Sequence, residues 1–194
     1  VAIEALNILA NDDLSQLGHN SGDYLHLVLE ALAVAFDDRA AHLADPDAVP
    51  DETLARLISP AYAEHRRRQI SSEHVRSGET DPSEPDAIIP KGATGDTVYL
   101  AAADAQGNLI SLIQSLYSGF GGGIVAGSTG IVLHNRGSLF NTDPLHPNHL
   151  APHKRPLHTL APAMVCRRGR PWLAFGVMGG DMQPQGHLQV LLNL

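Results

Sequence analysis

The pattern of apolar residues changes once along this 194-residue chain, and that change limits the folds that the chain can adopt. Residues 1–70 carry apolar side chains largely at helical spacing, broken by short polar and proline-containing segments. From residue 97 onward, short runs rich in Val, Ile, Leu and Tyr alternate with glycine-containing turns, which is typical of strands. Helices, then strands, then a last helix indicate an α+β fold in which helices cover a largely antiparallel sheet.

The helical part contains two main segments. Residues 24–43 lack Gly and Pro and are rich in Leu and Ala, so they predict a long helix with Ser21 or Asp23 as its N-cap. A second helix is expected over residues 52–70, with Pro60 marking an interruption or a restart. Its end contains three consecutive arginines, which we expect to be a solvated last turn that interacts favourably with the helix dipole.

The segment between the two parts has its own composition. Residues 71–95 are dominated by Ser, Glu, Pro, Gly and Asp and show no period. Such a segment is expected to be exposed and mobile, and a chain can be cut there without breaking a core. An ordinary interdomain loop would have the same composition, so cleavage does not follow from composition.

The second half predicts paired strands. Residues 97–118 indicate a hairpin whose turn includes Gly107 and Asn108. Further elements expected from the pattern are a strand over residues 130–135, two strands within residues 163–177 joined near Gly169, and a helix from about Gln183.

Composition excludes several classes of function. A formal net charge of −8 argues against nucleic acid or an anionic membrane as the partner. No stretch reaches the roughly 18 apolar residues needed to span a bilayer. The single cysteine, Cys166, excludes an internal disulfide and is expected to be a buried, inert thiol. Both ends fall inside apolar runs, so we interpret the chain as an internal segment of a longer protein, and the lack of a targeting sequence is uninformative.

Thr97 is the first residue of the predicted hairpin and follows the linker directly. A threonine hydroxyl needs a base beside it to act as a nucleophile, and cleavage of the preceding bond would turn its own α-amine into that base. A free α-amine has an unperturbed pKa of about 7.7–8, which suits proton transfer near neutral pH. Threonine is also a common strand residue, so its position does not establish this role.

Two glycine-containing segments are candidates for contact with a ligand. Gly179 and Gly180 lie between a strand and a helix, where backbone N–H groups could stabilise an oxyanion, although a tight turn needs glycine for conformational reasons too. The glycines of residues 119–130 lack the pattern of a phosphate-binding loop or a dinucleotide site. We therefore expect a flexible loop near a site and no cofactor.

Four histidines occur within residues 146–158. They lie among prolines, without the helical i, i+4 pairing or the cysteine partners of a zinc site. We expect no metal here and interpret these side chains as facing solvent or substrate.

Several ordered blocks of the sequence together resemble the γ-glutamyltransferases and their acylase-like relatives. These blocks cover nearly the whole chain, and they are residues 30–47 (EALAVAFDDRAAHLADPD), 57–70 (LISPAYAEHRRRQI), 96–135 (DTVYLAAADAQGNLISLIQSLYSGFGGGIVAGSTGIVLHN), 153–165 (HKRPLHTLAPAMV) and 169–187 (GRPWLAFGVMGGDMQPQGH). The resemblance implies a four-layer αββα sandwich of the N-terminal nucleophile hydrolase type, made as one precursor. Residues 1–70 would be the helical end of the large subunit, 71–96 the linker that ends at the cleavage site, and 97–194 the start of the small, catalytic subunit.

The resemblance also implies roles for single residues. Cleavage would fall between Asp96 and Thr97, and Thr97 would be the nucleophile of both self-cleavage and turnover. Ser115 would orient it, and Gly179 with Gly180 would form the oxyanion hole. The residues expected to contact substrate are Tyr117, Asn135, Arg136, His158 and Thr159.

The chain departs from the familiar γ-glutamyltransferase pattern in the residues that hold the glutamate. Tyr117 replaces an asparagine, Arg136 a glutamine, and Leu139 the aspartate that binds the glutamyl amino group, while His158 and Thr159 replace a serine pair. Removing the acidic partner would leave a partly buried ammonium unpaired, at a cost of several kcal/mol. Arg136 would favour a substrate with an additional negative charge.

Three functions are compatible with these residues. The first is a hydrolase or transpeptidase acting on γ-glutamyl amides such as glutathione, and the second is an acylase for another dicarboxylate-type acyl group, of the cephalosporin or glutaryl acylase kind. The third is an inactive, unprocessed homologue. The expected partners are a small amide substrate and the protein's own two subunits, with neither nucleic acid nor a membrane span. A homo-oligomer is also compatible with the sequence. The resemblance suggests a periplasmic or secreted location, and a cytoplasmic location is compatible with the sequence as well.

Overall fold

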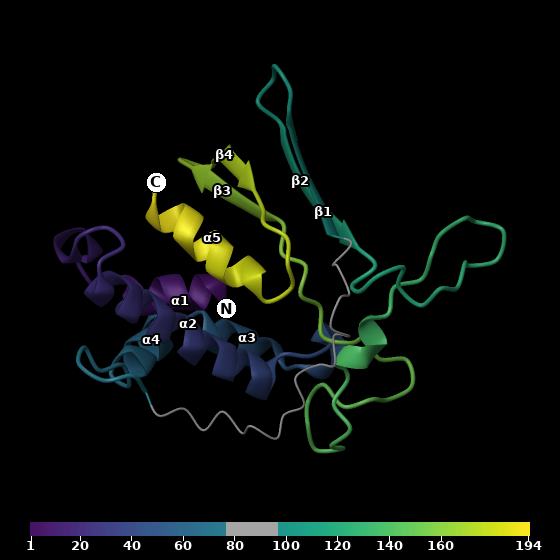
Figure 1. Ribbon diagram of the computed structural model, residues 1–194, viewed down its shortest axis with the longest axis horizontal. Coiled ribbons are helices and arrows are strands. Elements are labelled where there is room, and N and C mark those ends of the chain that lie inside the picture. Colours follow the sequence, from purple (N-terminus) through teal and green to yellow (C-terminus); the bar gives the residue numbers. More distant parts are fainter. Residues whose placement is uncertain (77–96) are drawn as a thin grey trace. The chain divides into compact units, whose positions relative to one another are not determined.

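The computed structural model describes residues 1–76 and 97–194, and the chain divides into two compact units. Unit 1 comprises Val1–Glu84 and Asn141–Lys154, and unit 2 comprises Pro85–Phe140 and Arg155–Leu194. The elements of unit 1 are α1 (Ala2–Leu9), the 3-10 turn η1 (Leu14–Leu17), α2 (Gly22–His42), η2 (Pro46–Ala48), α3 (Asp51–Leu57) and α4 (Pro60–Arg67) (Figure 1). Those of unit 2 are β1 (Thr97–Ala103), β2 (Leu109–Ser115), η3 (Arg136–Leu139), β3 (Ala163–Arg167), β4 (Arg170–Phe175) and α5 (Met182–Leu192).

The two predicted helical segments are confirmed, with adjusted ends. α2 starts after Ser21, whose hydroxyl accepts a hydrogen bond from the Tyr24 N–H at 3.1 Å, so Ser21 rather than Asp23 is the N-cap. The second segment consists of two helices, α3 and α4, because Ser59 caps a new helix that has Pro60 in its first turn. α4 ends at Arg67, three residues before the predicted end.

Unit 1 has a helical core in which α1 packs against both α2 and α4. Apolar side chains on one side of α1 and on one side of α2 are buried; they include Ala5, Ile8, Leu9, Leu27, Val28, Ala31, Leu32, Val34 and Ala35. Segment Asn141–Lys154 contacts these helices, since His146 Nε2 lies 3.0 Å from the carbonyl oxygen of Ala40. Helix–helix packing of an apolar stripe therefore holds this unit together.

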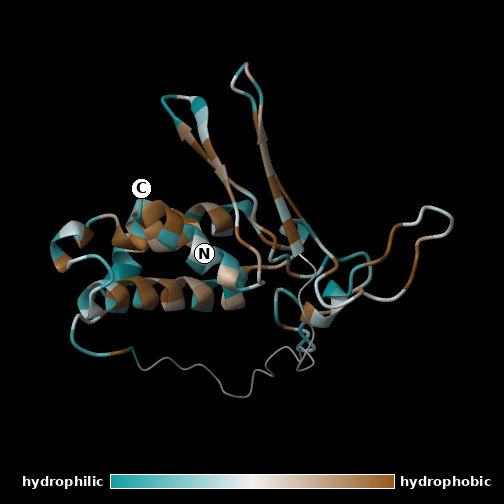
Figure 2. Cartoon of the chain, turned by 45° about the horizontal axis from the view of Figure 1, so that its top comes forward, coloured by the Kyte–Doolittle hydropathy of each residue, from teal (hydrophilic) through white to brown (hydrophobic). Residues whose placement is uncertain are grey.

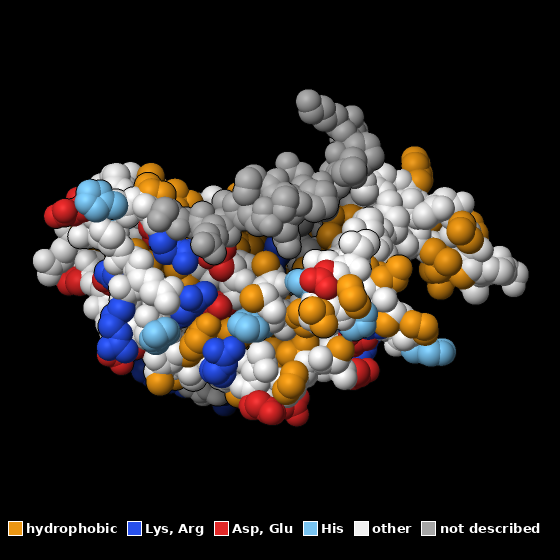
Figure 3. Space-filling view, turned by 90° about the horizontal axis from the view of Figure 1, so that it is seen from below, with side chains coloured by type: hydrophobic (Ala, Val, Ile, Leu, Met, Phe, Trp, Pro, Cys, Tyr) orange, Lys and Arg blue, Asp and Glu red, His pale blue; other side chains and the backbone are white. Residues whose placement is uncertain are grey.

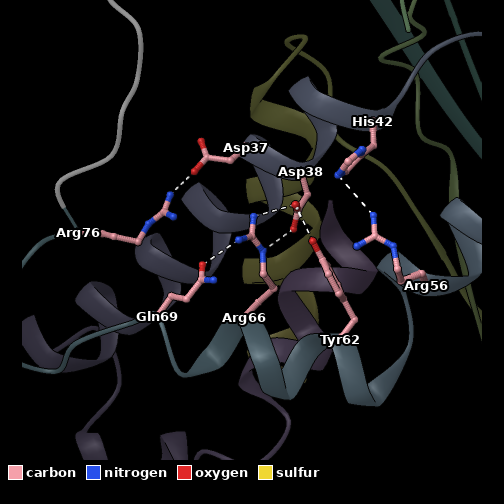
Figure 4. A network of polar contacts seen from close by, with 8 residues as sticks. All are labelled: Asp37, Asp38, His42, Arg56, Tyr62, Arg66, Gln69 and Arg76. Carbon is pink, nitrogen blue, oxygen red and sulfur yellow. Dashed lines mark hydrogen bonds and ion pairs between the residues drawn. The ribbon is translucent and has the colours of Figure 1, made fainter. Parts of the chain in front are cut away.

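A buried ion pair ties α2 to α4 (Figure 4). Arg66 donates through Nε and Nη2 to the two carboxylate oxygens of Asp38, at 2.8 and 2.7 Å, and Tyr62 donates its hydroxyl to Asp38 at 2.8 Å. Arg67 makes a similar bidentate pair with Asp12, at 2.7 Å for each bond. The prediction of a solvated basic turn is thus wrong for Arg66 and Arg67, because acidic residues distant in sequence supply partners that periodicity cannot reveal.

Glu4 lies beside this ion pair and is 2% exposed. Burial, together with a hydrogen bond and repulsion from Asp38, raises the pKa of Glu4 to about 8. Glu4 is therefore protonated at neutral pH, and Arg66 faces one carboxylate rather than two.

On the face that Figure 3 shows, basic side chains lie among acidic ones and do not form a continuous basic surface.

Unit 2 contains two antiparallel hairpins, β1–β2 and β3–β4, each a separate two-stranded sheet. The predicted hairpins at residues 97–118 and 163–177 are confirmed. Their strands contact each other near Gly176, since a side chain there would lie 2.5 Å from the Tyr99 ring. The Ser111 hydroxyl also donates to the Phe175 carbonyl oxygen at 3.4 Å. Glycine at position 176 is therefore needed for this close approach.

The strand predicted over residues 130–135 is not formed. Only Val132 makes an isolated antiparallel bridge, with Val125, inside an irregular glycine-rich arm of residues 122–133. Glycines with positive φ occur throughout this arm, including Gly123 at 67°, Gly127 at 53° and Gly130 at 73°. The left-handed backbone at these glycines interrupts regular strand pairing. The apolar residues for which the sequence predicted a strand therefore belong to the irregular arm.

α5 confirms the predicted last helix and packs within unit 2. Gly186 on α5 lies close to Val177, where an added side chain would approach to 2.7 Å, and Phe175 meets the His187 ring edge-on at 5.2 Å. Cys166 on β3 is exposed, so its predicted burial is wrong. Along β3, the half-buried Ala163 and Val165 alternate with the exposed Met164 and Cys166, so the thiol lies on the exposed face of the strand.

The described elements give a mixed α and β fold, and the four-layer arrangement stays a prediction. In Figure 2 the strands of both hairpins are largely apolar, while their turns are hydrophilic. No helix within residues 1–76 or 97–194 has both the length and the apolar character that crossing a membrane requires.

Asp38→Asn should lower the free energy of unfolding by about 2–3 kcal/mol, because Arg66 loses its carboxylate while largely buried. Chemical denaturation followed by circular dichroism measures this loss. Glu64→Gln is the matched control. It breaks the exposed Arg68–Glu64 pair at α4, the helix that carries Arg66, and should lower the free energy of unfolding by less than about 0.5 kcal/mol. Equal losses in the two variants would contradict a structural role for the buried pair.

Candidate active site

The β1–β2 hairpin brings Thr97 and Ser115 together. They are the first residue of β1 and the last of β2, and the antiparallel register pairs them directly. Residues paired in this way have side chains on the same face of the sheet. The Thr97 hydroxyl donates to Ser115 Oγ at 2.8 Å. The register of this hairpin therefore places the Thr97 hydroxyl against Ser115.

Ser115 Oγ accepts a second hydrogen bond, from the backbone N–H of Tyr117 at 2.9 Å. Tyr117 has a φ of 80°, in the left-handed region that residues other than glycine rarely adopt. A hydroxyl oxygen has two lone pairs, and both are used here by Thr97 and Tyr117. The position of the Ser115 oxygen is thus fixed from two sides.

Asn135 holds the loop that follows β2. Its Oδ1 accepts from the Ser118 N–H at 3.1 Å, and its Nδ2 donates to the carbonyl oxygens of Ser118 and Gly121 at 3.0 and 3.2 Å. These three bonds engage both hydrogens of the amide nitrogen and one lone pair of the oxygen. In this structure Asn135 therefore shapes the loop, and its predicted contact with substrate stays a prediction.

Arg136 is a buried cation, with 2% of its surface exposed. Its Nη1 donates to Thr159 Oγ1 at 2.7 Å, and its guanidinium carbon lies 4.9 Å from the centre of the Tyr117 ring. Within the part of the chain that the structure describes, no carboxylate forms an ion pair with Arg136. Burial lowers the pKa of Arg136, as expected for a charge removed from water without a counter-ion.

Two histidines adjoin Arg136. The backbone N–H of Arg136 donates to Nδ1 of His134 at 3.2 Å, and that of Leu160 donates to Nδ1 of His158 at 3.2 Å. Burial lowers the pKa of His158, and the nearby Arg136 and His134 lower it further. Both rings accept at Nδ1, which leaves Nε2–H as a donor in the neutral form. In the neutral form, each ring therefore has one donor, Nε2–H, that its Nδ1 contact does not use.

Gly179 and Gly180 form the turn between β4 and α5. Their φ values are 112° and 58°, and their carbonyl oxygens accept from the N–H groups of Met182 and Gln183 at 3.0 and 3.1 Å. An added side chain at Gly180 would meet no atom within 4 Å, so the backbone is accessible there. The role of this pair as an oxyanion hole stays a prediction.

The sequence model named Gamma-glutamyltranspeptidase matches residues 1–194. The chain belongs to this family. It is 44% identical to the glutathione hydrolase-like YwrD proenzyme of Bacillus subtilis (strain 168) over 189 residues, which is 97% of the chain and 34% of that protein. It is also 37% identical to the acylase ACY 1 proenzyme of Pseudomonas sp. (strain V22) over 194 residues, which is 98% of the chain and 33% of that protein.

Among solved structures, the cephalosporin acylase from Bacillus halodurans superposes with a TM-score of 0.80 at 40% identity, over 99% of this chain and 33% of that one. The chain therefore spans about a third of the length of the relatives it matches. Family members with hydrolase names and with acylase names are both among its relatives.

This transpeptidase-family chain brings five of the predicted site residues into two connected groups. Thr97, Ser115 and the Tyr117 backbone form one group, and Arg136 with Thr159 forms the other. The Tyr117 ring joins them through its contact with Arg136. Asp96 lies outside the described residues. Those same residues, 1–76 and 97–194, contain no group of three or more His, Cys, Asp or Glu placed to hold a metal ion.

Two features of this site were not anticipated. One is the left-handed backbone of Tyr117, and no sequence signal points to it because tyrosine disfavours that conformation. The other is His134, whose position directly before Asn135 and Arg136 was the only available indication.

Asn135→Asp should loosen the loop after β2, because a carboxylate cannot donate to the carbonyl oxygens of Ser118 and Gly121. Amide hydrogen exchange over residues 116–121 should become roughly tenfold faster, the effect of losing about 1.4 kcal/mol. Asn193→Asp, on the exposed end of α5, is the control and should leave this loop unchanged. Unaltered exchange in the Asn135 variant would show that these bonds do not hold the loop.

Proposed function

We propose that this chain is part of an N-terminal threonine amide hydrolase or transpeptidase that cleaves itself between Asp96 and Thr97. The observation that carries this proposal is the 2.8 Å hydrogen bond between the Thr97 hydroxyl and Ser115 Oγ at the start of β1. Membership of the γ-glutamyltranspeptidase family and the proenzyme names of its relatives support it.

In self-cleavage, the Thr97 oxygen attacks the carbonyl carbon of Asp96. The C–N bond to Thr97 breaks as the hydroxyl proton passes to the leaving nitrogen, which becomes a free amine, and water hydrolyses the resulting ester to give the Asp96 carboxylate. In turnover, the free α-amine removes the hydroxyl proton as the oxygen attacks the substrate amide, and it returns the proton to the leaving amine. The acyl group is then released from Thr97 to water or to an acceptor amine.

Ser115 and the glycine turn have separate roles in this proposal. Ser115 orients the Thr97 oxygen and accepts the Tyr117 N–H, so it cannot rotate freely. The N–H groups of Gly179 and Gly180 stabilise the oxyanion of the tetrahedral intermediate, a contribution of about 2.7–4 kcal/mol per donor in comparable sites.

The acyl group is proposed to carry a carboxylate. Arg136 is buried without a carboxylate partner among the described residues, and it already donates to Thr159. A carboxylate from the substrate would neutralise this charge and could accept two parallel hydrogen bonds from the guanidinium. The lowered pKa of His158 keeps that ring neutral at neutral pH, so Arg136 is the charge that a substrate carboxylate would meet.

Both γ-glutamyl amides, such as glutathione, and amides of other dicarboxylic acids satisfy this requirement. Leu139, half-buried at the end of η3, favours the second group, because it offers no charge to a substrate ammonium where the familiar family pattern has an aspartate. We therefore keep an acylase for a dicarboxylate-type acyl group as the second candidate function. The names of the acylase relatives support it.

The domain arrangement is also a proposal. Residues 1–70 would end the large subunit, residues 71–96 would form the linker, and residues 97–194 would begin the small subunit of a four-layer αββα sandwich. Residues 77–96 of this linker lie outside the described part of the chain. One face of the β1–β2 hairpin supports the layered fold, because it exposes a set of apolar side chains, namely Val98, Leu100, Ile110 and Leu112. Such a face requires cover from another layer.

Thr97→Ala should abolish self-cleavage and lower turnover at least about 10³-fold, because no other group can form the acyl-enzyme. Intact mass under denaturing conditions, taken fresh and after incubation at neutral pH, follows cleavage in the full-length protein. Thr97→Ser keeps a hydroxyl and should still cleave, and Thr129→Ala, at the exposed tip of the glycine-rich arm, should cleave normally.

Two outcomes would contradict the proposal. Amidase activity that survives in the Thr97→Ala protein would exclude Thr97 as the nucleophile. A single wild-type mass that stays unchanged for days would favour an inactive homologue or a precursor that needs a trigger.

Leu139→Asp should raise kcat/KM for γ-glutamyl anilide at least about tenfold relative to glutaryl anilide, which lacks only the α-amino group, because a carboxylate can pair with the ammonium. Leu139→Asn has the same size as the aspartate variant and no charge, so it should change the ratio much less. If the aspartate variant shows no gain, Leu139 does not determine acyl selectivity.

A further inference from the structure

Tyr117 occupies a backbone conformation that is unfavourable for its residue type. Its φ of 80° brings Cβ close to the following carbonyl group, which is unfavourable for an L-residue other than glycine. Asparagine and aspartate tolerate this region better than an aromatic residue does. A conformation of this kind persists only where surrounding contacts hold it.

Because φ is the rotation about the N–Cα bond, this conformation sets how the Tyr117 side chain is directed relative to the Tyr117 N–H. The N–H points to Ser115 Oγ at 2.9 Å, and the same oxygen accepts the Thr97 hydroxyl at 2.8 Å. The Tyr117 backbone therefore contributes to the placement of the atom that orients Thr97. If Tyr117 took an ordinary extended φ while its ring stayed against Arg136, its N–H would turn away from Ser115.

The Tyr117 side chain is held by Arg136. The guanidinium carbon lies 4.9 Å from the ring centre, within the range of a cation–π contact. Arg136 is itself fixed, because it is buried and donates to Thr159 Oγ1 at 2.7 Å and to His134 Nδ1 through its backbone N–H. Nearby, the Asn135 side chain accepts from the backbone N–H of Ser118 and donates to the carbonyl oxygen of Ser118.

We infer that Arg136 and Tyr117 are positioning residues that link the acyl-binding cation to the orientation of the nucleophile. The contacts run from Thr159 to the Arg136 guanidinium, to the Tyr117 ring and backbone, to Ser115 Oγ, and to the Thr97 hydroxyl. This inference rests on the proposed function, in which Thr97 is the nucleophile. It adds that Arg136 acts on Thr97 even when no substrate is bound.

Self-cleavage separates this role from substrate binding. It uses the Thr97 hydroxyl but no external acyl group, so a residue that only binds the acyl carboxylate has no effect on it. Before cleavage, the Thr97 nitrogen is an amide and cannot act as a base. The rate of self-cleavage should therefore depend more strongly on the orientation of the Thr97 hydroxyl by Ser115 than the rate of turnover does. A change at Arg136 should therefore be visible in the precursor.

The test compares self-cleavage rates in the full-length precursor. Arg136→Met, which keeps an unbranched side chain but removes the guanidinium and its charge, should slow self-cleavage roughly tenfold, the rate equivalent of about 1.4 kcal/mol. Arg136→Lys retains a cation and should recover part of that rate. The matched control is Arg167→Met, which removes another arginine–aromatic contact, with Trp172 at 5.7 Å on β4, and should cleave at the wild-type rate.

A double-mutant cycle tests the route through Tyr117. Tyr117→Asn removes the ring and tolerates the left-handed backbone. In that background, Arg136→Met should cause little further loss, because the contact it breaks is already absent. Additive effects of the two changes, or wild-type self-cleavage in Arg136→Met, would overturn the inference and leave Arg136 as a substrate ligand only.

A second measurement does not depend on catalysis. In the Thr97→Ala precursor, hydrogen exchange of the Tyr117 amide should be at least several-fold faster with Arg136→Met than without it, since the bond to Ser115 is loosened. Unchanged exchange would overturn the inference. A wild-type precursor that never cleaves would count against the proposed function, while the exchange result would still decide the coupling.

Discussion

The antiparallel pairing of β1 with β2 is the constraint on which the rest of the candidate site depends. It sets Thr97 opposite Ser115, and a shift of one residue in register would turn one of the two side chains to the other face. Tyr117 then adds its N–H to the same serine oxygen, and Asn135 secures the loop that carries Tyr117. The site is thus built mostly from short-range contacts within one hairpin and its loop, which a single compact unit can supply.

The second organising feature is a buried positive charge that lacks a carboxylate partner among the described residues. Unit 1 shows how this protein treats a cation that serves structure: Arg66 is held by both oxygens of Asp38 and flanked by the Tyr62 hydroxyl. Arg136 has a threonine hydroxyl and an aromatic ring instead. The contrast between these two arginines is the physical basis for assigning Arg136 to a ligand and Arg66 to stability.

The sequence pattern was sufficient where one local signal dominated. The α2 helix, its Ser21 cap, the restart at Pro60 and both hairpins followed from periodicity, capping and turn residues. It failed where a distant partner or a backbone angle decided the outcome. Asp12 and Asp38 converted a basic run into ion pairs, glycines broke the strand expected at residues 130–135, and the left-handed Tyr117 had no signature at all. Within the site, the resemblance indicated which residues matter, whereas the contact between Arg136 and the Tyr117 ring required coordinates.

The position of Thr97 at the end of a ladder of seven residue pairs has a consequence for the chain after a cut. A new chain end ordinarily frays, and the freedom that it gains scatters any reactive group it carries. Thr97, which would become the new N-terminal residue, is already paired with Ser115 in the β1–β2 sheet, and its side chain is hydrogen-bonded to Ser115 Oγ. Breaking the bond before it would release the preceding segment but not the threonine. Cleavage would then change the chemical identity of one nitrogen while leaving the hydroxyl beside it in place.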